Sequence, residues 1–474
     1  MPIHKPIHLL TCVLLAASPV VGQSDWPMFR GVNGSGHAQA TLPADLSLEK
    51  HLAWKVAVPK GYSSPVIVGD RIFLTAEDGD DLITLCLNKT TGKEAWRKTA
   101  PRPRKEKLDQ RSHAAAASAV VSRDSVVVFF GDYGLLCYSL DGEERWRRPL
   151  GPFNNLYGMG ASPVIIDGKA ILVCDQQKGS FVVAVDLKTG DIAWRTDRPE
   201  ATSGHCTPIV YRPEGKPGQV LVAGSFSLTA YLVQSGKKVW WVNGLSFEMK
   251  STPVIADGLL FINGYASPYN QPDKKVKIAP YADVVAKQDA NENGVLEKSE
   301  MPDQLSRSFF DFINLDSNDF VDKDEWRYFE VSMASDNSMM AMTLGGKGDV
   351  TKDNLRWRYH KNIPQLPSPI ATDGHLYMIS DAGIVTNFEA KTGRVHTRGR
   401  LKGASGSVYV SPIVVGEHIL FLTTKGTLAM VPINDKIEVQ NTIKFNEPCF
   451  ATPAVVDGRL FVRTNESLFC LGTP

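Results

Sequence analysis

The residues best suited to chemistry lie in an acidic segment near the middle of the chain. Residues 281–330 contain 13 acidic and 5 basic side chains, a local net charge of −8. Within this segment, oxygen-bearing residues alternate from Asp289 to Glu300, and Gly294 stands at the sixth position. Calcium prefers about six to eight oxygen ligands, and a glycine lets the chain turn sharply around the ion. The pattern therefore predicts a calcium-binding loop, with a solvated acidic loop as the alternative.

The first loop resembles the twelve-residue loop of the EF-hand family at every ligand position. Leu296 also fills the apolar eighth position, which packs beneath the ion. The resemblance implies side-chain, carbonyl, water-mediated and bidentate carboxylate ligands in a fixed order. In chain order these expected ligands are Asp289, Asn291, Asn293, the carbonyl of Val295, Glu297 through water, and Glu300.

A second loop has the same spacing but departs from the family pattern twice. Asn314 replaces the usual Asp at position 1, and Asp319 replaces the Gly at position 6. A lost charge and an Asp in a left-handed conformation predict weaker binding. We expect Met301 to Ile313 to form a single helix that joins the two loops, and the loops to share a short strand contact. The expected ligands of the second loop are Asn314, Asp316, Asn318, the carbonyl of Phe320, Asp322 and Glu325.

The elements that position this acidic segment belong to a repeat of about 45 residues. Each unit opens with Ser/Thr-Pro, or a close variant, followed by β-branched residues; a Gly/Asp turn, further apolar strands and often a Trp four residues after a Gly follow. From Pro163 to Pro208 to Pro253 the spacing is 45 residues each time. The eight opening residues are Ser64, Ser118, Ser162, Thr207, Thr252, Ser368, Ser411 and Thr452.

Four short antiparallel strands per unit predict an all-β fold, an eight-bladed β-propeller. The eighth unit ends at Leu471 after three strands, and residues 52–58 carry the Trp of a fourth strand with no blade before it. We expect this N-terminal strand to complete the last blade and close the ring, which removes exposed edges. The repeated Trp residues are expected to dock each outer strand on the neighbouring blade. Thr397 takes this position in the sixth unit, and the seventh unit has no Trp.

Ser/Thr-Pro-Val, the apolar strand and Thr-Gly-x-x-x-Trp together resemble the repeat of the pyrroloquinoline-quinone (PQQ)-like propeller superfamily, over residues 52–471 apart from one insertion. One branch, the quinoprotein dehydrogenases, implies PQQ and a metal in the central channel. The other branch, the outer-membrane assembly (BamB-like) propellers, implies protein partners and no cofactor. No two cysteines are adjacent and no Cys-x-x-Cys-His occurs, so two features of many quinoprotein dehydrogenases are missing.

The acidic segment interrupts the fifth repeat. Pro253 and Pro369 are 116 residues apart, which leaves about 70 residues beyond the usual spacing. We assign 52–474 to the propeller and 270–335 to a small α-helical EF-hand insertion within blade 5. In a four-stranded blade, the loop between strands two and three lies on the face where the Ser/Thr-Pro segments enter the channel. The insertion and the basic linker from Arg97 to Arg111 are therefore expected on that face.

The first 22 residues have the charged start, the apolar run and the small residues of a signal peptide. The apolar run from Ile7 to Ala17 is about half the length that a membrane anchor needs, so anchoring is the less favoured alternative. Residues 23–51 form an N-terminal extension. The protein is expected in the periplasm or secreted, with six cysteines kept as small buried residues, since equivalent positions of separate repeats rarely meet.

The net charge of +1 excludes a generally basic nucleic-acid binder. We expect a monomeric, calcium-binding scaffold that binds a protein or cell-envelope polymer on the face carrying the EF-hand lobe, without a transmembrane segment. The alternative is a PQQ-dependent dehydrogenase-like enzyme with its cofactor in the central channel. Ca²⁺ in the lobe is the expected cofactor, and PQQ in the channel is possible but less favoured. No catalytic residue is assigned. Candidates for such an enzyme lie just before the strand-one motifs, at His113, Tyr157, His205, Lys250 and Tyr409.

Overall fold

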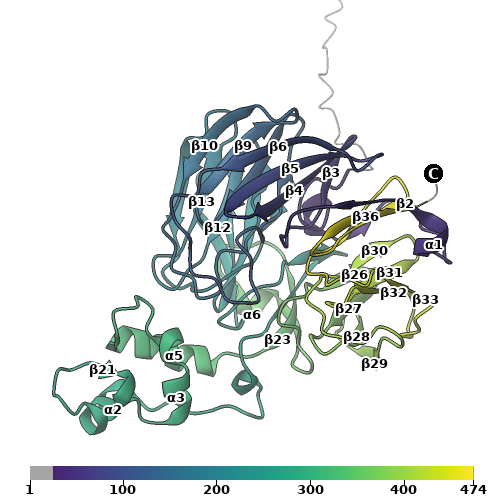
Figure 1. Ribbon diagram of the computed structural model, residues 1–474. Helices are drawn as coiled ribbons and strands as arrows, with labels where there is room; N and C mark the ends of the chain where they lie inside the picture. The colour runs from purple at the N-terminus through teal and green to yellow at the C-terminus, as the bar shows by residue number, and fades with distance from the viewer. Residues whose placement is uncertain (1–24, 473–474) are drawn as a thin grey trace, which may run out of the picture.

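The structure is a computed structural model that describes residues 25–472, so the predicted signal peptide lies outside the described residues. The chain forms eight antiparallel sheets arranged as the blades of a propeller (Figure 1). The all-β, eight-bladed prediction is confirmed. Among the described residues, every helix is too short or too polar to cross a lipid bilayer.

The first four blades follow one another without interruption, and each runs from a short inner strand to an outer one. They are β3 (Val66–Val68), β4 (Arg71–Asp78), β5 (Asp81–Asn88) and β6 (Glu94–Ala100); β7 (Val120–Val121), β8 (Ser125–Phe130), β9 (Gly134–Ser139) and β10 (Glu144–Pro149); β11 (Val164–Ile166), β12 (Lys169–Cys174), β13 (Phe181–Asp186) and β14 (Ile192–Asp197); β15 (Ile209–Tyr211), β16 (Gln219–Gly224), β17 (Ser227–Leu232) and β18 (Lys238–Asn243). A short strand, β24 (Gly348–Asp349), adds to β18 in parallel, and α6 (Thr351–Asn354) follows it.

Blades 5 to 8 complete the ring. They are β19 (Val254–Ala256), β20 (Leu259–Gly264), β23 (Ser338–Thr343) and β25 (Leu355–Tyr359); β26 (Ile370–Thr372), β27 (His375–Ile379), β28 (Ile384–Glu389) and β29 (Val395–Arg400); β30 (Ile413–Val415), β31 (His418–Leu422), β32 (Thr427–Pro432) and β33 (Asn441–Lys444); β34 (Ala454–Val456), β35 (Arg459–Arg463), β36 (Ser467–Leu471) and β2 (Leu52–Ala57).

The N-terminal strand closes the ring as expected. β2, which follows the short helix α1 (Leu48–His51), pairs antiparallel with β36, and Trp54 lies opposite Cys470. In Figure 1 the purple start of the chain lies beside its yellow end at this blade. Because β2 supplies the outer strand of blade 8, the first and last parts of the chain are held in one sheet.

The N-terminal extension also crosses the inner strands of several blades. Trp26 forms a β-bridge with Ile67 of blade 1, and β1 (His37–Ala38) runs parallel to β30 of blade 7. Between them the buried Arg30 donates to the carbonyl of Pro369 in blade 6 at 2.8 Å, and the 3-10 turn η1 (Val32–Gly34) follows it. Because the Pro27 carbonyl also accepts from the Val121 N–H of blade 2, the extension ties blade 2 to blade 6, on the opposite side of the ring.

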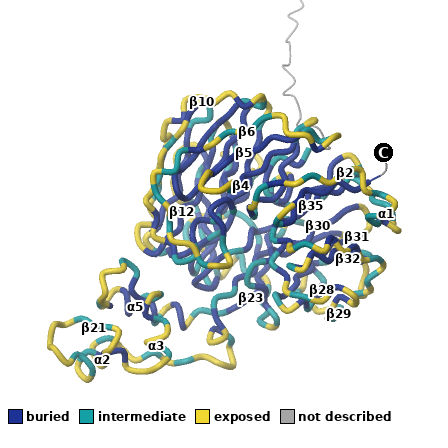
Figure 2. The backbone as a smooth tube through the Cα atoms, in the orientation of Figure 1, coloured by how far each residue is buried: buried dark blue, intermediate teal, exposed yellow. Residues whose placement is uncertain are grey.

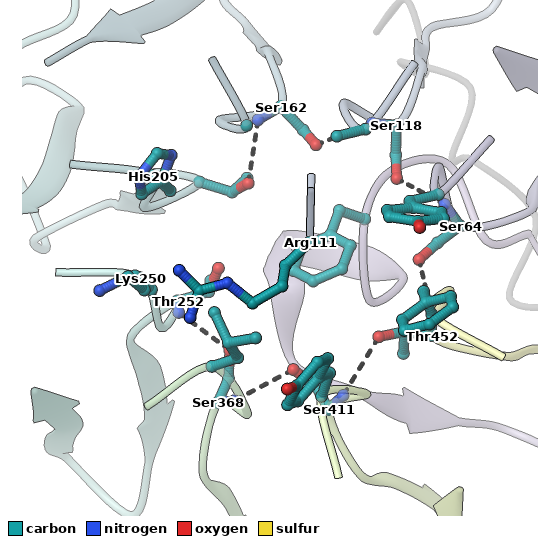
Figure 3. A pocket seen from close by; sticks show the side chains of 18 residues that line it. Ser64, Arg111, Ser118, Ser162, His205, Lys250, Thr252, Ser368, Ser411 and Thr452 are labelled. Atoms are coloured by element: carbon teal, nitrogen blue, oxygen red, sulfur yellow. Dashed lines mark hydrogen bonds between the residues drawn. The ribbon is translucent and has the colours of Figure 1, made fainter. Parts of the chain in front are cut away.

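Seven hydrogen bonds link the repeat-opening residues around the central channel, with one gap in the ring between Thr207 and Thr252 (Figure 3). The backbone N–H of one blade's Ser or Thr donates to the hydroxyl oxygen of the next, as from Ser64 to Ser118 at 2.9 Å. Six further bonds of 2.9–3.3 Å repeat this link around the ring and return from Thr452 to Ser64. The Ser/Thr positions therefore join neighbouring blades rather than perform chemistry.

The tryptophans dock outer strands on the neighbouring blade, as expected. In five seams the indole Nε1 donates to a carbonyl oxygen of the next blade at 2.8–3.2 Å. The glycine of the next blade's turn lies against the ring: a Cβ at Gly236, where φ is +68°, would lie 2.4 Å from Trp194. Trp240 differs, since its Nε1 donates to Gln219 of its own blade.

The core of the ring is made of six clusters of buried residues, and the strands of the blades are mostly buried in Figure 2. Cysteines 86, 137, 174, 206, 449 and 470 are all buried and free, in agreement with the sequence expectation. Burial raises their pKa values, and for Cys86 the pKa is about 12, so these thiols are unreactive packing groups.

The insertion leaves blade 5 between β20 and β23 and forms a lobe outside the ring (Figure 1). Its helical elements are η2 (Pro268–Asn270), α2 (Tyr281–Gln288), η3 (Lys298–Glu300), α3 (Gln304–Ser308), α4 (Phe310–Ile313) and α5 (Lys323–Ala334). The expected strand contact is present, because β21 (Leu296–Glu297) pairs with β22 (Phe320–Val321).

The single helix expected from Met301 to Ile313 is wrong. The helix starts later, where the Asp303 side chain caps the backbone N–H of Ser306 at 2.7 Å, and it is interrupted at Phe309. There the backbone leaves helical values, with φ −95° and ψ 6°, while the Phe309 ring packs between Phe312 and Phe329. Aromatic packing inside the lobe accompanies the break.

Candidate functional site

The central channel widens into a mouth on one face of the propeller. Two overlapping cavities, of about 190 Å³ each, share much of their walls there. One residue from each blade lines this mouth, always two positions before the Ser or Thr that opens the repeat. In blade order these are Tyr62, Ala116, Gly160, His205, Lys250, Leu366, Tyr409 and Phe450.

The small residues of blades 2 and 3 leave room for two larger side chains from the linkers. Arg111, from the basic linker, points into the channel (Figure 3), and Tyr157 lines the mouth beside it. The Arg111 guanidinium lies 5.5 Å from the centre of the Tyr157 ring, and the Lys250 ammonium lies 5.5 Å from the same centre. Two cations thus contact one aromatic ring, an arrangement that stabilises both.

Each of these cations already has a carboxylate partner. Arg111 donates to both oxygens of Asp109, at 2.7 and 3.1 Å. Lys250 donates to Glu248, and the two side chains are only 6% and 2% exposed. The second oxygen of Glu248, Oε1, is buried without a hydrogen-bond partner. The mouth therefore carries opposite charges in pairs rather than a free positive field.

The histidine of the mouth is held neutral. Burial lowers the pKa of His205 to about 3, and the nearby Lys250 charge adds to this effect. Its Nε2 atom is shielded from solvent and has no hydrogen-bond partner. In contrast, burial raises the pKa of Asp381 to about 6, because the desolvation of this carboxyl outweighs the hydrogen bonds from the Gln365 and Leu366 backbone.

Four of the five enzyme candidates from the sequence meet at the mouth, and the fifth does not. Tyr157, His205, Lys250 and Tyr409 line the cavity. His113 lies behind it, with its ring 5.1 Å from that of Tyr62, and burial lowers its pKa to about 4.

Sequence reasoning missed Tyr62, Phe450 and Arg111 as residues of the mouth. The first two follow the same rule as Tyr409, two positions before the repeat-opening residue, so the register of the repeat would have found them. The sequence placed Arg111 only in a basic linker on this face, without a role in the channel. The rest of that linker is also structured, since Arg102 pairs with Asp132 at 2.7 Å.

The two loops of the lobe have matching backbones. In the first, Glu300 accepts from the backbone N–H groups of Ala290 and Glu297 at 2.9 and 3.0 Å. In the second, Glu325 accepts in the same way from Leu315 and Asp322, at 2.7 and 3.1 Å. The sixth positions are both left-handed, with φ +83° at Gly294 and +72° at Asp319, as the sequence predicts for Asp319.

Hydrogen bonds link the remaining ligand candidates of the first loop to one another and to the backbone of the same turn. Asp289 accepts from the backbone of Asn293 and Gly294, the Asn293 side chain accepts from the Val295 N–H, and Asn291 donates to Glu297. These bonds fix oxygen-bearing side chains within one turn of the chain. The donor set is that of a hard divalent cation, and it fits calcium.

The second loop is arranged alike but already contacts a cation of the propeller. Asn314 and Asp316 both accept from the Asn318 N–H, and the Asn318 side chain accepts from Phe320. Lys178, in the turn between β12 and β13, pairs with Asp316 at 2.9 Å. Burial raises the pKa of Glu325, and the charges of Asp316 and Asp322 add to the rise. This loop is therefore both a candidate ion site and a contact with blade 3.

The lobe borders the mouth. Phe312 lies 6.0 Å from Tyr157 and 6.4 Å from Phe247, measured between ring centres. Tyr328 of α5 hydrogen-bonds to Thr202 and Ser225 of the neighbouring blades. The lobe thus lies on the face where the channel opens, as expected from the position of the insertion within its blade.

Comparison with known proteins supports the resemblance to BamB-like propellers. Residues 46–209 match the family model described as outer membrane protein assembly factor BamB. The outer membrane protein assembly factor BamB of Alkalilimnicola ehrlichii is 29% identical over 140 residues, which cover 29% of this chain and 33% of that protein. The match thus spans about a third of the length of that curated relative.

Solved structures extend the likeness to nearly the whole chain. BamB from Moraxella catarrhalis has a TM-score of 0.55 at 11% identity, over 89% of this chain and 97% of that one. A europium-containing methanol dehydrogenase has the same TM-score at 10% identity, over 95% and 98%. At these identities the structures establish the propeller fold alone. The resemblance to PQQ-like, BamB-like repeat propellers is confirmed.

Proposed function

We propose that this BamB-like propeller is a periplasmic or secreted scaffold whose lobed mouth binds segments of other proteins, and that its lobe binds calcium. The observation that carries the proposal is the mouth itself, a recess walled by Tyr62, Tyr157, Tyr409 and Phe450 in which the charges are already paired. Aromatic side chains and paired charges are typical of recognition surfaces, where aromatic anchors supply most of the binding energy.

A mouth of this kind is poorly suited to acid–base or quinone chemistry. Burial keeps His205 neutral, its Nε2 atom has no hydrogen-bond partner, and no carboxylate lies in hydrogen-bond contact with the ring among the described residues. PQQ is a polyanion, and the cations that would bind it are neutralised by Asp109 and Glu248. The residues present therefore do not fit PQQ, and we assign no catalytic step to the mouth. An envelope polymer remains the second class of partner.

Calcium would be held in the first loop by Asp289, Asn291, Asn293, Val295, Glu297 and Glu300, and in the second loop by the equivalent six residues from Asn314 to Glu325. The ion supplies a positive charge that neutralises clustered carboxylates and so rigidifies the lobe. Because Phe312 packs against Tyr157 of the mouth, an ordered lobe extends the binding surface on that side.

The test combines calorimetry with peptide binding. Fluorescent peptides rich in aromatic residues should bind the purified protein, and Tyr409→Ala should weaken them about tenfold or more, as for an interface anchor. Trp241→Ala is the matched control, since this aromatic residue lies on an outer strand beside Lys238. Calcium should titrate into the lobe, whereas PQQ should give no saturable heat. Saturable PQQ binding that Tyr157→Ala abolishes would refute the scaffold proposal.

A further inference from the structure

The seam between blades 6 and 7 is one of those that lack the tryptophan dock found in five other seams. At the register where β14 carries Trp194, β29 of blade 6 carries Thr397, which pairs with Asn387 as Trp194 pairs with Ala184. The residue before it, His396, is the bulged residue of the outer strand. A bulge redirects the side chain of the extra residue. Blade 6 must therefore contact blade 7 by other side chains.

Those side chains form a cluster of two histidines and a carboxylate. His396 Nδ1 lies 3.3 Å from Asp435 Oδ1, and His375 Nδ1 lies 3.9 Å from the same oxygen. The two imidazole centres are 5.2 Å apart, and one potential ligand atom from each of the three residues lies within 4.8 Å of the others. His375 and His396 come from blade 6, and Asp435 comes from the loop between β32 and β33 of blade 7.

The backbone beside Asp435 is firmly held by blade 6. The carbonyl of Asn434 accepts hydrogen bonds from Tyr377 Oη and Asn387 Nδ2, both at 2.8 Å. The same Asn387 turns its Oδ1 toward His375 Nδ1, at 3.2 Å. The cluster is therefore positioned by strands and by a bonded loop, and a further oxygen donor lies next to it.

We propose that His375, His396 and Asp435 bind a zinc ion that joins blade 6 to blade 7. Zinc binds imidazole nitrogen and carboxylate oxygen at about 2.0–2.2 Å in tetrahedral sites, which places neighbouring ligand atoms about 3.4 Å apart. The two measured separations from Asp435 bracket that value. Imidazole selects zinc over calcium and magnesium, which prefer oxygen.

Solvent reaches the site from the carboxylate side. The histidine side chains are 19% and 14% exposed, whereas Asp435 is 71% exposed. Three protein ligands leave a fourth position, which water or Asn387 Oδ1 fills. The ion does at this seam what an indole does elsewhere, since it links an outer strand to the next blade.

The experiment measures zinc binding by the whole purified protein, after treatment with a chelator and in saturating calcium so that the lobe does not compete. We expect the wild type to bind a single equivalent of zinc and to gain thermal stability from it. Cobalt(II) in place of zinc should give the intense visible bands of a tetrahedral site. Removing a residue that merely supports a ligand weakens metal sites about 10–100-fold, so His396→Ala should weaken zinc by more than that.

His418→Ala is the matched control, because His418 starts a strand of blade 7 but bonds to Gln440 outside the cluster. It should bind zinc as the wild type does. Asp435→Asn, a change at an exposed residue, tests the site if His396→Ala fails to fold, and it should also lose zinc. An ordinary histidine–aspartate pair predicts no zinc-dependent stabilisation and no tetrahedral cobalt spectrum. Either of these results, or equal zinc affinity in wild type and Asp435→Asn, would overturn the proposal.

Discussion

In the propeller each blade is held by its neighbours, whereas the lobe has a core of its own. Hydroxyl bonds, indole docks and the N-terminal strand all join one blade to another, some over more than 380 positions of sequence. The core of the lobe is formed by residues 284–333 alone, around Trp326 and Phe329. Figure 2 shows the same contrast, with long buried strands in the ring and mostly exposed loops in the lobe. A destabilising change in the propeller should therefore unfold the whole ring, whereas one in the lobe should unfold the lobe alone.

The largest effect is expected where the ring closes. Deletion of residues 23–60 removes β2 and the extension, exposes the edge of β36 and breaks the bonds of Arg30 to blades 6 and 7. An unpaired edge promotes aggregation, so we expect an insoluble or unfolded propeller, measured by soluble yield and circular dichroism. A soluble truncation with an unchanged melting temperature would show that closure by β2 is dispensable.

A matched pair of tryptophan substitutions compares the two regions directly. Trp194 docks blade 3 on Gly236 of blade 4, while Trp326 is buried in the lobe and donates to the Ala279 carbonyl at 2.8 Å. Replacing a buried Trp by Ala costs about 3–5 kcal/mol. Trp194→Ala should lower the main melting transition. Trp326→Ala should leave that transition in place and make residues 281–333 sensitive to protease, and a joint loss of both regions in either variant would contradict their independence.

Calcium should act on the lobe alone. Glu300→Gln removes a charged ligand from the first loop, so it should lose most of the calcium affinity and the protection of residues 281–333 from proteolysis. At a hundredfold excess over the dissociation constant, bound calcium stabilises the lobe by about 2.7 kcal/mol. Glu325→Gln should cost less, because the second loop has Asn314 at position 1. A chelator that unfolded the whole propeller, or left the lobe equally protected, would refute this assignment.

The sequence predicted the features that recur in each repeat. It missed the features that depend on contacts between separate segments of the chain. Local patterns that recur predicted the repeat period, the order of the strands and the docking role of Trp194. They also predicted that residues 52–58 complete the last blade. The break at Phe309 could not be predicted, because the packing against Phe329 that accompanies it joins positions 20 residues apart. Arg111 was missed because its position is set by the small side chains of Ala116 and Gly160, which lie in different blades. The cluster around Asp435 is likewise visible only once blades 6 and 7 are side by side.

The smallest expected effect concerns pH, and it separates the mouth from the lobe. The pKa of His205 is lowered to about 3 in the folded protein, so the unfolded chain binds the proton more readily. Its contribution to stability is therefore fully present above the unfolded pKa of about 6.5 and is lost as pH falls from there toward 3. Between pH 7 and 5 this loss is at most about 2 kcal/mol, since one pKa unit corresponds to about 1.4 kcal/mol.

His205→Asn should consequently make the main melting temperature less dependent on pH in this window. His418→Asn serves as the control and should melt with the pH dependence of the wild type. The pKa of His113 is also lowered, and the pKa of Asp381 is raised. Both residues are present in the wild type and in the variant, so their effects do not alter the difference between the two proteins. The proteolysis of residues 281–333 should not change with His205→Asn, because this residue belongs to the ring. An unaltered pH slope in His205→Asn would mean that the imidazole is solvated in the folded protein and that the mouth is wetter than its aromatic walls imply.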